Sequence, residues 1–405
     1  MMQIFKMAFR DLGRNRRRSF FSALAVAIGL GLLMLMSSVI QGEMGSAIES
    51  AIKLQSGHIQ IRAVSYDENK SSLKWEDLIE NPDQIAEQVA TLEQVKAATP
   101  RLFASGFLST GDESTGVQIY GIDPQSVAND PYRDGMVNGN FLTAEDREGL
   151  LIGKPAAEKL HLQTGDKVSL SVNTSNGDVQ EQIFTIRGIY TTDTYGFDSN
   201  TVLLPLTKAQ TLTQTENHAS TIFVLLKDTS FTDQVVNAIN APNLDVLNWR
   251  DLNVLFVEFE TMAQSYIFFF YLIILAITVS VIINTLIMSV YERTREIGIL
   301  SAIGMRSGRI MGLFLAESIL LAIGGVLMGL VVGVVSVRLF NINGFYIGNM
   351  GLSGMLVSDT IRAVLTVENT VRVATMTFIA TILSGLYPAV MASRLEPVEA
   401  LRAEK

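Results

Sequence analysis

The sequence of 405 residues contains no cysteine. Disulfides, a thiol nucleophile and cysteine-ligated metal sites are therefore excluded. Histidine is almost as scarce, because only His58, His161 and His218 occur, and they lie far apart along the chain. Such scattered histidines favour surface or strand positions over a metal site. The chain also lacks the Gly-x-Ser-x-Gly and His-Glu-x-x-His motifs of serine hydrolases and zinc proteases. The sequence therefore predicts no hydrolytic or metal chemistry.

A nucleotide-binding loop is missing as well. Gly153-Lys154 is the only Gly-Lys pair, and a Walker A loop needs a glycine five positions before that glycine and Ser or Thr after the lysine. Glu148 and Pro155 occupy these two positions. No motif pairs the many carboxylates for glycosidase-type chemistry. We therefore predict that this chain is not an enzyme, carries no fused ATPase and binds no cofactor itself.

Charge is distributed unevenly along the chain. Residues 43–263 contain 15 Lys and Arg against 31 Asp and Glu, whereas the net charge of the whole sequence is only −9. The remaining segments are therefore net basic. An acidic central part with basic flanks argues against nucleic-acid binding. We interpret the acidity as a means of solubility rather than as a recognition site.

Four long apolar stretches predict a membrane protein. Residues 19–42 carry no charge and would reach about 36 Å as a helix, enough to cross a hydrocarbon core of about 30 Å. This stretch is too long for the apolar part of a usual signal peptide, and no clear cleavage site follows, so we interpret it as an uncleaved first span. The other predicted spans are residues 264–291, 310–337 and 373–393.

The basic residues predict the orientation of these spans. They concentrate in residues 1–18, 292–309 and 394–405, which the positive-inside rule places in the cytoplasm. Residues 43–263 and the 338–372 loop are then extracytoplasmic. The sequence therefore predicts a multi-pass protein of the inner (cytoplasmic) membrane with both termini in the cytoplasm.

The acidic part is typical of a mixed α/β domain. Glu43–Leu54 is predicted to continue the first span as a helical stalk that ends near Gly57. A second, β-rich unit is predicted over about residues 130–215, and no internal repeat is detectable. Strands are predicted at residues 58–62, 117–122, 150–153, 181–189, 201–204 and 221–226, and helices at 82–92 and 231–239. Residues 159–172 are predicted to form a helix, a turn and a further strand. The predicted fold class is membrane α with an extracytoplasmic α/β domain between the first and second of four transmembrane helices.

The loop after the second span combines charge with helical periodicity. Its apolar residues Ile297, Leu300 and Ile303 recur at the spacing of one helix face. A charged turn of both signs precedes them, formed by Glu292, Arg293, Arg295 and Glu296. Periodicity leaves two interpretations open, a helical elbow between spans and a surface helix that offers its apolar face to a partner.

Residues 290–305 closely resemble the signature of the FtsX-like, or MacB-type, ABC transporter permeases. The resemblance continues in Phe314–Glu317, in the C-terminal Leu395–Arg402 and in the N-terminal Ala8–Arg18. It implies that the loop is a coupling helix that docks on a cytoplasmic ATPase, and that the outer domain is a porter-like unit with an inserted β-rich subdomain. The implied coupling positions are Glu292, Arg293, Arg295, Glu296, Ile297, Gly298, Leu300, Ile303 and Gly304.

Polar and small residues of the spans predict internal packing. Gly325, Gly329 and Gly333 share one face of the third span, which allows another helix to approach closely. Glu317 lies in the same span, where an unpaired charge costs several kcal/mol. Because a single acid makes a poor proton relay, we predict a structural polar contact, with Asn284 of the second span as its partner.

The outer ends of the first two spans allow two interpretations. The aromatic run that begins at Tyr266 is either an interfacial belt or the rim of a cavity for lipid chains. If two copies pack through these spans, they would frame an uncharged cavity suited to acyl chains, although packing between the copies explains the same residues. The candidate lining is Leu32, Leu33, Met34, Met36, Val39, Ile40, Phe268, Phe269 and Tyr271.

The family resemblance implies a permease subunit that works by mechanotransmission. Two copies, identical or related, would act on a dimer of separate ATPase subunits that bind ATP and Mg²⁺. Cargo would be extruded on the outer side, and the chain layout is closest to the lipoprotein-releasing members. Other possible partners are a chaperone, an adaptor and membrane lipid. Alternatives are peptide or drug efflux with a periplasmic adaptor and an FtsX-like regulator of a cell-wall hydrolase. A secondary transporter is disfavoured, because the spans show one acid and no repeat.

Overall fold

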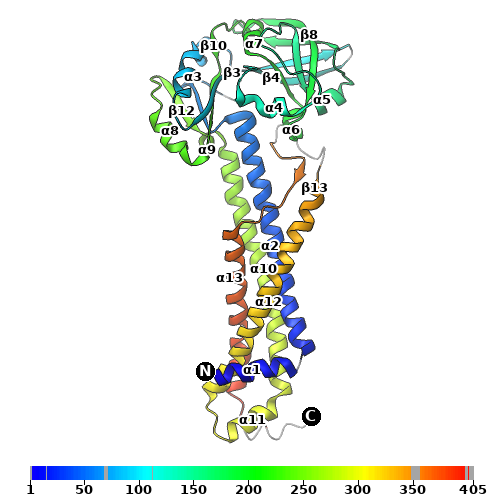
Figure 1. Ribbon diagram of the computed structural model, residues 1–405, viewed down its shortest axis with the longest axis vertical. Coiled ribbons are helices and arrows are strands. Elements are labelled where there is room, and N and C mark those ends of the chain that lie inside the picture. The colour runs from blue at the N-terminus through cyan, green and yellow to red at the C-terminus, as the bar shows by residue number, and fades with distance from the viewer. Residues whose placement is uncertain are drawn as a thin grey trace. The chain divides into compact units, whose positions relative to one another are not determined.

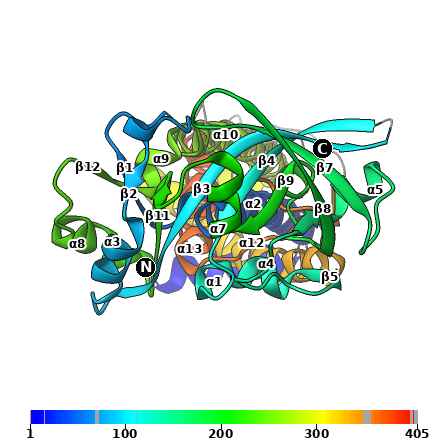
Figure 2. The ribbon, with the colours of Figure 1, turned by 90° about the horizontal axis from the view of Figure 1, so that it is seen from above.

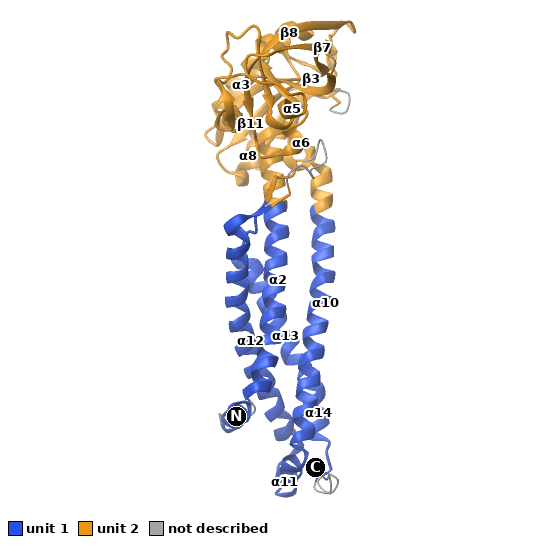
Figure 3. Ribbon diagram, turned by 90° about the vertical axis from the view of Figure 1, so that its right-hand side faces the viewer, with its two compact units in different colours: residues 1–43, 260–345, 361–405 blue, residues 44–259, 346–360 orange. Residues whose placement is uncertain are grey.

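The computed structural model describes residues 2–14, 16–67, 72–111, 113–347, 356–396 and 400. The chain divides into two compact units, which Figure 3 distinguishes by colour. The helical unit comprises residues 1–43, 260–345 and 361–405, and the α/β unit comprises residues 44–259 and 346–360. Part of the predicted C-terminal motif, including Arg402, and the basic Lys405 lie outside the described residues.

Among the described residues, four helical segments are long and apolar enough to cross a membrane. Figures 1 and 3 show their helices α2, α10, α12 and α13 side by side. Within the described residues, the structure thus contains a helix at each of the four predicted spans. The helices of this part of the chain are α1 (Met2–Arg14), α2 (Arg16–Ser50), α10 (Val254–Glu292), α11 (Thr294–Ala302), α12 (Ser307–Asn343), α13 (Val367–Ser384) and α14 (Leu386–Ser393).

The fourth span is interrupted at Gly385, between α13 and α14. Pro388 explains the interruption, because its ring would clash with the carbonyl of Ser384 in a continuous helix. Ser384 is the last residue of α13. The proline lies in the first turn of α14, where its missing N–H leaves no intrahelical hydrogen bond unmade.

The glycine stripe of α12 packs against α2, as predicted. A Cβ on Gly325 would lie 2.6 Å from the Cβ of Val26, and one on Gly329 would lie 2.9 Å from that of Leu30. Gly333 faces Met34 in the same way. Steps of four residues on both helices keep the contact on one side of each. Because the three glycines of α12 carry no side chains, the two helices can approach each other closely.

The first span continues beyond the predicted membrane boundary. α2 runs to Ser50 and is followed by a π-helical segment, Ala51–Ser56, so the predicted helical stalk is confirmed. Gly57 ends it with a φ of 71°, which favours glycine. A Cβ at Gly57 would also lie 2.9 Å from the carbonyl oxygen of Val224. The sharp end of this helix therefore depends on glycine.

The α/β unit is built on one large sheet, whose strand order is β12-β1-β11-β3-β4-β9-β6-β8-β5. From above, β11, β3, β4, β9 and β8 follow one another across Figure 2. The bounds are β1 (Ile59–Ala63), β3 (Val95–Thr110), β4 (Glu113–Ile122), β5 (Met136–Gly139), β6 (Gly149–Gly153), β7 (Lys167–Asn173), β8 (Val179–Tyr190), β9 (Thr201–Pro205), β11 (Thr221–Leu226) and β12 (Leu244–Asn248). The remaining strands are the short β2 (Ile79–Glu80), β10 (His218–Ala219), β13 (Phe345–Tyr346) and β14 (Thr360–Ile361).

Strand β7 closes part of this sheet into a barrel. It pairs with β3 on one side and with β8 on the other. The six strands β3-β4-β9-β6-β8-β7 therefore form a continuous ring. Their inward side chains are fully buried and form the largest apolar core, which includes Leu108, Ile119, Leu150, Leu170, Phe184 and Val202.

Short helices cover the sheet. The side chains of α7 (Leu206–Thr213) complete the barrel core, and α3 (Pro82–Ala90) and α8 (Thr232–Ala238) pack on β1 and β11. The remaining α-helices are α4 (Asp130–Asp134), α5 (Lys154–Lys159), α6 (Tyr195–Asp198) and α9 (Trp249–Leu252). Turns of 3-10 helix span Trp75–Asp77, Val127–Asn129 and Thr229–Phe231.

The predicted strands overlap with β1, β4, β6, β7, β8, β9 and β11, but the longest strand, β3, was not predicted. Pro100 lies within it, opposite Ile222 of β11, and a proline argues against a central strand. The boundary predicted near residue 130 is also wrong. The second half of β3 and all of β4 precede that residue, yet β4 pairs with β9 inside the barrel.

Candidate coupling site

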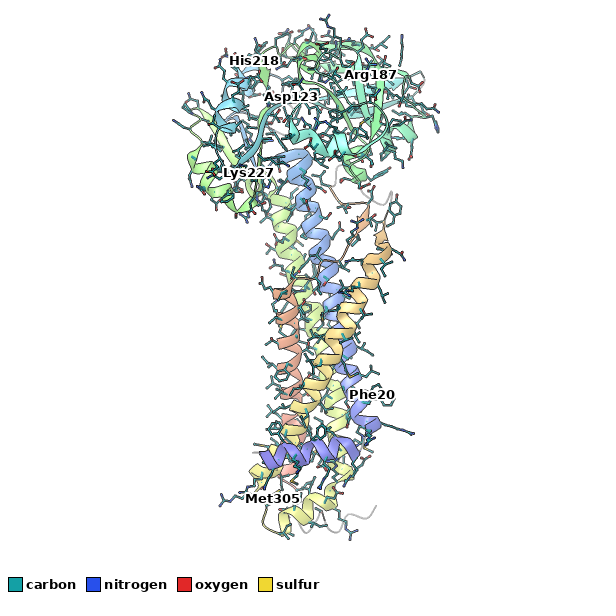
Figure 4. All side chains as sticks on the ribbon, in the orientation of Figure 1. Phe20, Asp123, Arg187, His218, Lys227 and Met305 are labelled. Atoms are coloured by element: carbon teal, nitrogen blue, oxygen red, sulfur yellow. The ribbon has the colours of Figure 1, made fainter. Side chains whose placement is uncertain are left out.

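The predicted coupling loop is a short helix held between two turns. α10 ends at Glu292, and α11 spans Thr294–Ala302. Gly304 follows with a φ of 92°, a conformation that side chains disfavour. Figure 4 marks the neighbouring Met305 beside this turn. The glycine at position 304 is therefore explained by the backbone, because it makes the turn that follows the end of α11.

Arg293, at the junction of α10 and α11, is buried in an ion cluster. Its side chain is 7% exposed, and its Nη1 lies 2.8 Å from Oε1 of Glu317 and 3.2 Å from Oδ2 of Asp11. Its Nη2 also donates to the backbone oxygen of Asp11 at 3.1 Å. Asp11 belongs to α1 and Glu317 to α12. One guanidinium therefore links three helices.

This cluster corrects two predictions. The partner of Glu317 is Arg293 rather than Asn284, whose side chain is exposed on α10. Asn284 was a poor choice of partner, because the sequence does not show which faces of the second and third spans contact each other. Arg293 was expected on the exposed charged turn, but it is buried because it neutralises carboxylates inside the helical unit.

The two glutamates of the turn pair with the basic N-terminal segment. Arg14 Nη2 lies 2.7 Å from Oε1 of Glu296. Arg18 forms a bidentate pair with Glu292, in which its Nη1 donates to Oε2 at 2.6 Å. From the sequence, these arginines indicate the orientation of the first span and form part of the N-terminal resemblance. The partners are 282 and 274 residues apart, so no local pattern could reveal the pairing.

Only part of the predicted apolar face of α11 is exposed. Ile297 is 3% exposed and packs against Val290 and Phe314, so the prediction that it faces a partner is wrong. Gly298 is buried as well, and Leu300 is half-buried. Burial of this side attaches α11 to the rest of the helical unit. The exposed apolar residues are Ile299, at 48%, and Ile303, at 77%, and Arg295 and Glu296 on the same helix are also exposed.

A small polar cavity lies beside the ion cluster. It has a volume of about 20 Å³, and its polar lining includes Ser19, Ser22 and Ser289 together with Arg293 and Glu317. That volume fits about one water molecule. Among the described residues, the Oγ of Ser22 and the Nε of Arg293 have no protein partner. The cavity therefore has the polar groups that one bound water requires.

The residues proposed to line a cargo cavity divide into two groups. Leu33, Met34 and Tyr271 are buried in one apolar cluster of the chain's own helices, so their assignment to an open cavity is wrong. Met34 packs against Gly333 of the glycine stripe on α12, and Leu33 and Tyr271 lie in the same cluster. The residues that remain accessible are Met36, Val39 and Ile40, which are half-buried, and Leu32, Phe268 and Phe269, which are exposed.

Two segments of the chain match two known families. Residues 19–241 match a MacB-like periplasmic core domain, and residues 268–397 match the C-terminal part of an FtsX-like permease. The chain belongs to the FtsX-like, MacB-type permeases. It is therefore an ABC transporter permease and a membrane protein with several apolar helices.

Named relatives fall into two groups. The chain is 23% identical to the lipoprotein-releasing system transmembrane protein LolC of Neisseria meningitidis, over 98% of both chains. It is 23% identical to LolE of Haemophilus influenzae, over 94% of this chain and 93% of the relative. The macrolide export ATP-binding/permease protein MacB of Nitrobacter winogradskyi is 26% identical, over 98% of this chain but only 59% of the relative.

Proposed function

We propose that this MacB-type permease couples ATP hydrolysis by a separate cytoplasmic ATPase to extrusion of cargo on the outer side of the inner membrane. The observation that carries the proposal is the exposed apolar pair formed by Ile299 of α11 and Ile303, which directly follows that helix. A short helix that, together with the residue after it, exposes two isoleucines suits an apolar groove on a soluble partner.

The ion cluster supports the transmission of force. Arg293 connects α11 to α1 and α12, and Arg14 at the end of α1 and Arg18 in the first turn of α2 add further contacts. A displacement of α11 by the ATPase would thus act on several helices at once. ATP and Mg²⁺ are bound by the partner subunit in this proposal. Two permease copies, identical or related, would assemble on two ATPase subunits.

Lipoprotein or another acylated molecule is the proposed cargo. The exposed Leu32, Phe268 and Phe269 are uncharged and offer an apolar surface to acyl chains or to a second copy. The lipoprotein-releasing relatives match along nearly their whole length. Efflux of a peptide or drug with a periplasmic adaptor is the second candidate, since the MacB relatives match all but a small part of this chain.

The proposed orientation follows the basic residues. α1, α11 and the C-terminal segment face the cytoplasm, and residues 44–259 face the outside. The basic residues of α1 that remain exposed, among them Lys6 and Arg10, support this orientation under the positive-inside rule.

Substitution of Ile303 tests the coupling role. Because this side chain is 77% exposed, Ile303→Asp should leave the permease folded but place a charge in the apolar contact, with a loss of about 2–5 kcal/mol of association. Less ATPase should then co-purify with the tagged chain, and ATP-driven transport should fall. Val137→Asp, at a 53% exposed position of β5, is the matched control. Wild-type recovery of the ATPase with Ile303→Asp would refute the assignment.

A further inference from the structure

Arg101 of β3 is a buried arginine that has no carboxylate partner among the described residues. It is 0% exposed. Its Nη1 donates to the backbone oxygen of Leu54 at 2.8 Å, and its Nη2 donates to Oδ1 of Asn129 at 3.0 Å. The guanidinium also stacks on the ring of Phe223, 3.5 Å from the ring centroid. Among the described residues, every recorded hydrogen-bond acceptor of this cation is therefore neutral.

The carbonyl that Arg101 holds lies at the end of the helix that begins as α2. Leu54 belongs to the π-helical segment Ala51–Ser56. The amide of His58, which could continue the helical pattern, donates to Val224 instead. The Leu54 oxygen therefore accepts from Arg101 and, at 2.7 Å, from the buried hydroxyl of Tyr132. Carbonyls at a helix end carry partial negative charge and need such donors.

Stability alone gives a weak reason for this arginine. Burial lowers the pKa of Arg101, because removing a cation from water without a counter-charge is costly. An apolar side chain of similar length would fill the space without that cost. What a guanidinium adds is a rigid fork that fixes its acceptors in direction. Here the fork holds the end of the α2 segment, the Asn129 side chain and β3 in one arrangement.

Arg101 lies at the point of β3 where the pairing partner of the strand changes. The strand pairs with β11 up to Arg101, and from Leu102 onward it pairs with β4 of the barrel. A load applied at Leu54 therefore reaches the strand where its two halves meet. We infer that Arg101 is a positioning residue that passes movement of α2 into both halves of the outer domain. Its contacts with Leu54 and Asn129 are called the joint below.

This inference rests on the proposed mechanotransmission, but the joint is measurable without it. Spin labels on Glu49→Cys in α2 and Val179→Cys in β8, in the cysteine-free full-length chain, report the distance across the joint by pulsed electron resonance. Both sites are exposed. In nanodiscs without nucleotide, the wild-type joint should give one narrow distance distribution. Arg101→Met should give a broad or double one, and Arg101→Lys an intermediate one. A narrow distribution for Arg101→Met overturns the joint.

A second measurement separates positioning from plain structural support. In the reconstituted complex with its ATPase, Arg101→Met should keep ATP hydrolysis and the melting temperature near wild type. Release of a fluorescent diacylated lipopeptide per ATP should fall at least about fivefold, a difference of about 1 kcal/mol. Parallel losses of melting temperature and release would show a structural role only and overturn the inference. Arg133→Met is the control, because that partly exposed arginine pairs with Asp130 instead.

Failure of the proposed function gives a different pattern. If the wild-type complex hydrolyses ATP but releases no lipopeptide, the cargo proposal fails. The label distances still decide whether the joint exists, because they need neither cargo nor nucleotide.

Discussion

The two units each bury an arginine, and they treat the charge in opposite ways. In the helical unit, Arg293 contacts the carboxylates of Asp11 and Glu317. In the α/β unit, Arg101 contacts backbone and amide oxygens. The first arrangement depends on charge, because loss of the arginine leaves two carboxylates without a partner. The second depends on direction, because loss of the arginine leaves neutral groups. The comparison separates an electrostatic link between helices from a geometric cap on a helix end.

Removal of Arg293 should have the largest effect on stability. Arg293→Ala leaves Glu317 buried without its cation, at an expected cost of about 3–5 kcal/mol. Thermal melting of the full-length chain in nanodiscs measures this loss. The double variant Arg293→Met with Glu317→Met removes both charges and should recover much of the stability. If Arg293→Ala melts like wild type, the cluster is not an electrostatic link.

The buried carboxyl of Asp198 in the α/β unit extends the comparison from buried cations to a buried acid, and its effect should depend on pH. Asp198 is 0% exposed, and its Oδ2 accepts from the backbone amide of Thr192 at 2.8 Å and from Oγ1 of Thr191 at 2.9 Å. Burial raises the pKa of Asp198 from 3.8 to about 6. The folded form therefore holds its proton more tightly than the unfolded form between these values. Stability from this group is highest below pH 4 and falls as pH rises through 6, by on the order of 2–3 kcal/mol.

Hydrogen exchange measures this effect in the full-length chain. After correction for the intrinsic exchange rate, amides of residues 191–198 should be better protected at pH 5 than at pH 8. Asp198→Asn should flatten the difference. Better protection at pH 8 in the wild type would contradict the raised pKa of this carboxyl.

The exposed pairs near the ion cluster should have the smallest effect. The side chains of Arg14 and Glu296 are 55% and 53% exposed, and such pairs contribute about 0.2–1 kcal/mol. Arg14→Ala should therefore lower the melting temperature slightly at low salt and not at high salt. The charge-swapped double variant, Arg14→Glu with Glu296→Arg, should restore it. A large loss of melting temperature that persists at high salt would contradict this prediction and show that the pair contributes as much as the buried cluster.

The sequence alone determined the features that depend on neighbours along the chain. Apolar length predicts each span, four-residue spacing of Gly325, Gly329 and Gly333 predicts the close contact, and Gly57 marks the end of the first long helix. These features can be predicted from the sequence because they depend on backbone geometry and on the length of apolar stretches, which are local properties. The helical character of the coupling segment is likewise local.

Only the tertiary structure decided which distant residues meet. Periodicity placed Ile297 and Ile303 on one helix face, but contact with Val290 and Phe314 buries the first and leaves the second exposed. Closure of the barrel required β7 to pair with both β3 and β8. The partners of Arg293 and Arg101 are likewise distant in sequence. Burial and pairing depend on the packing of whole elements, which no local pattern encodes.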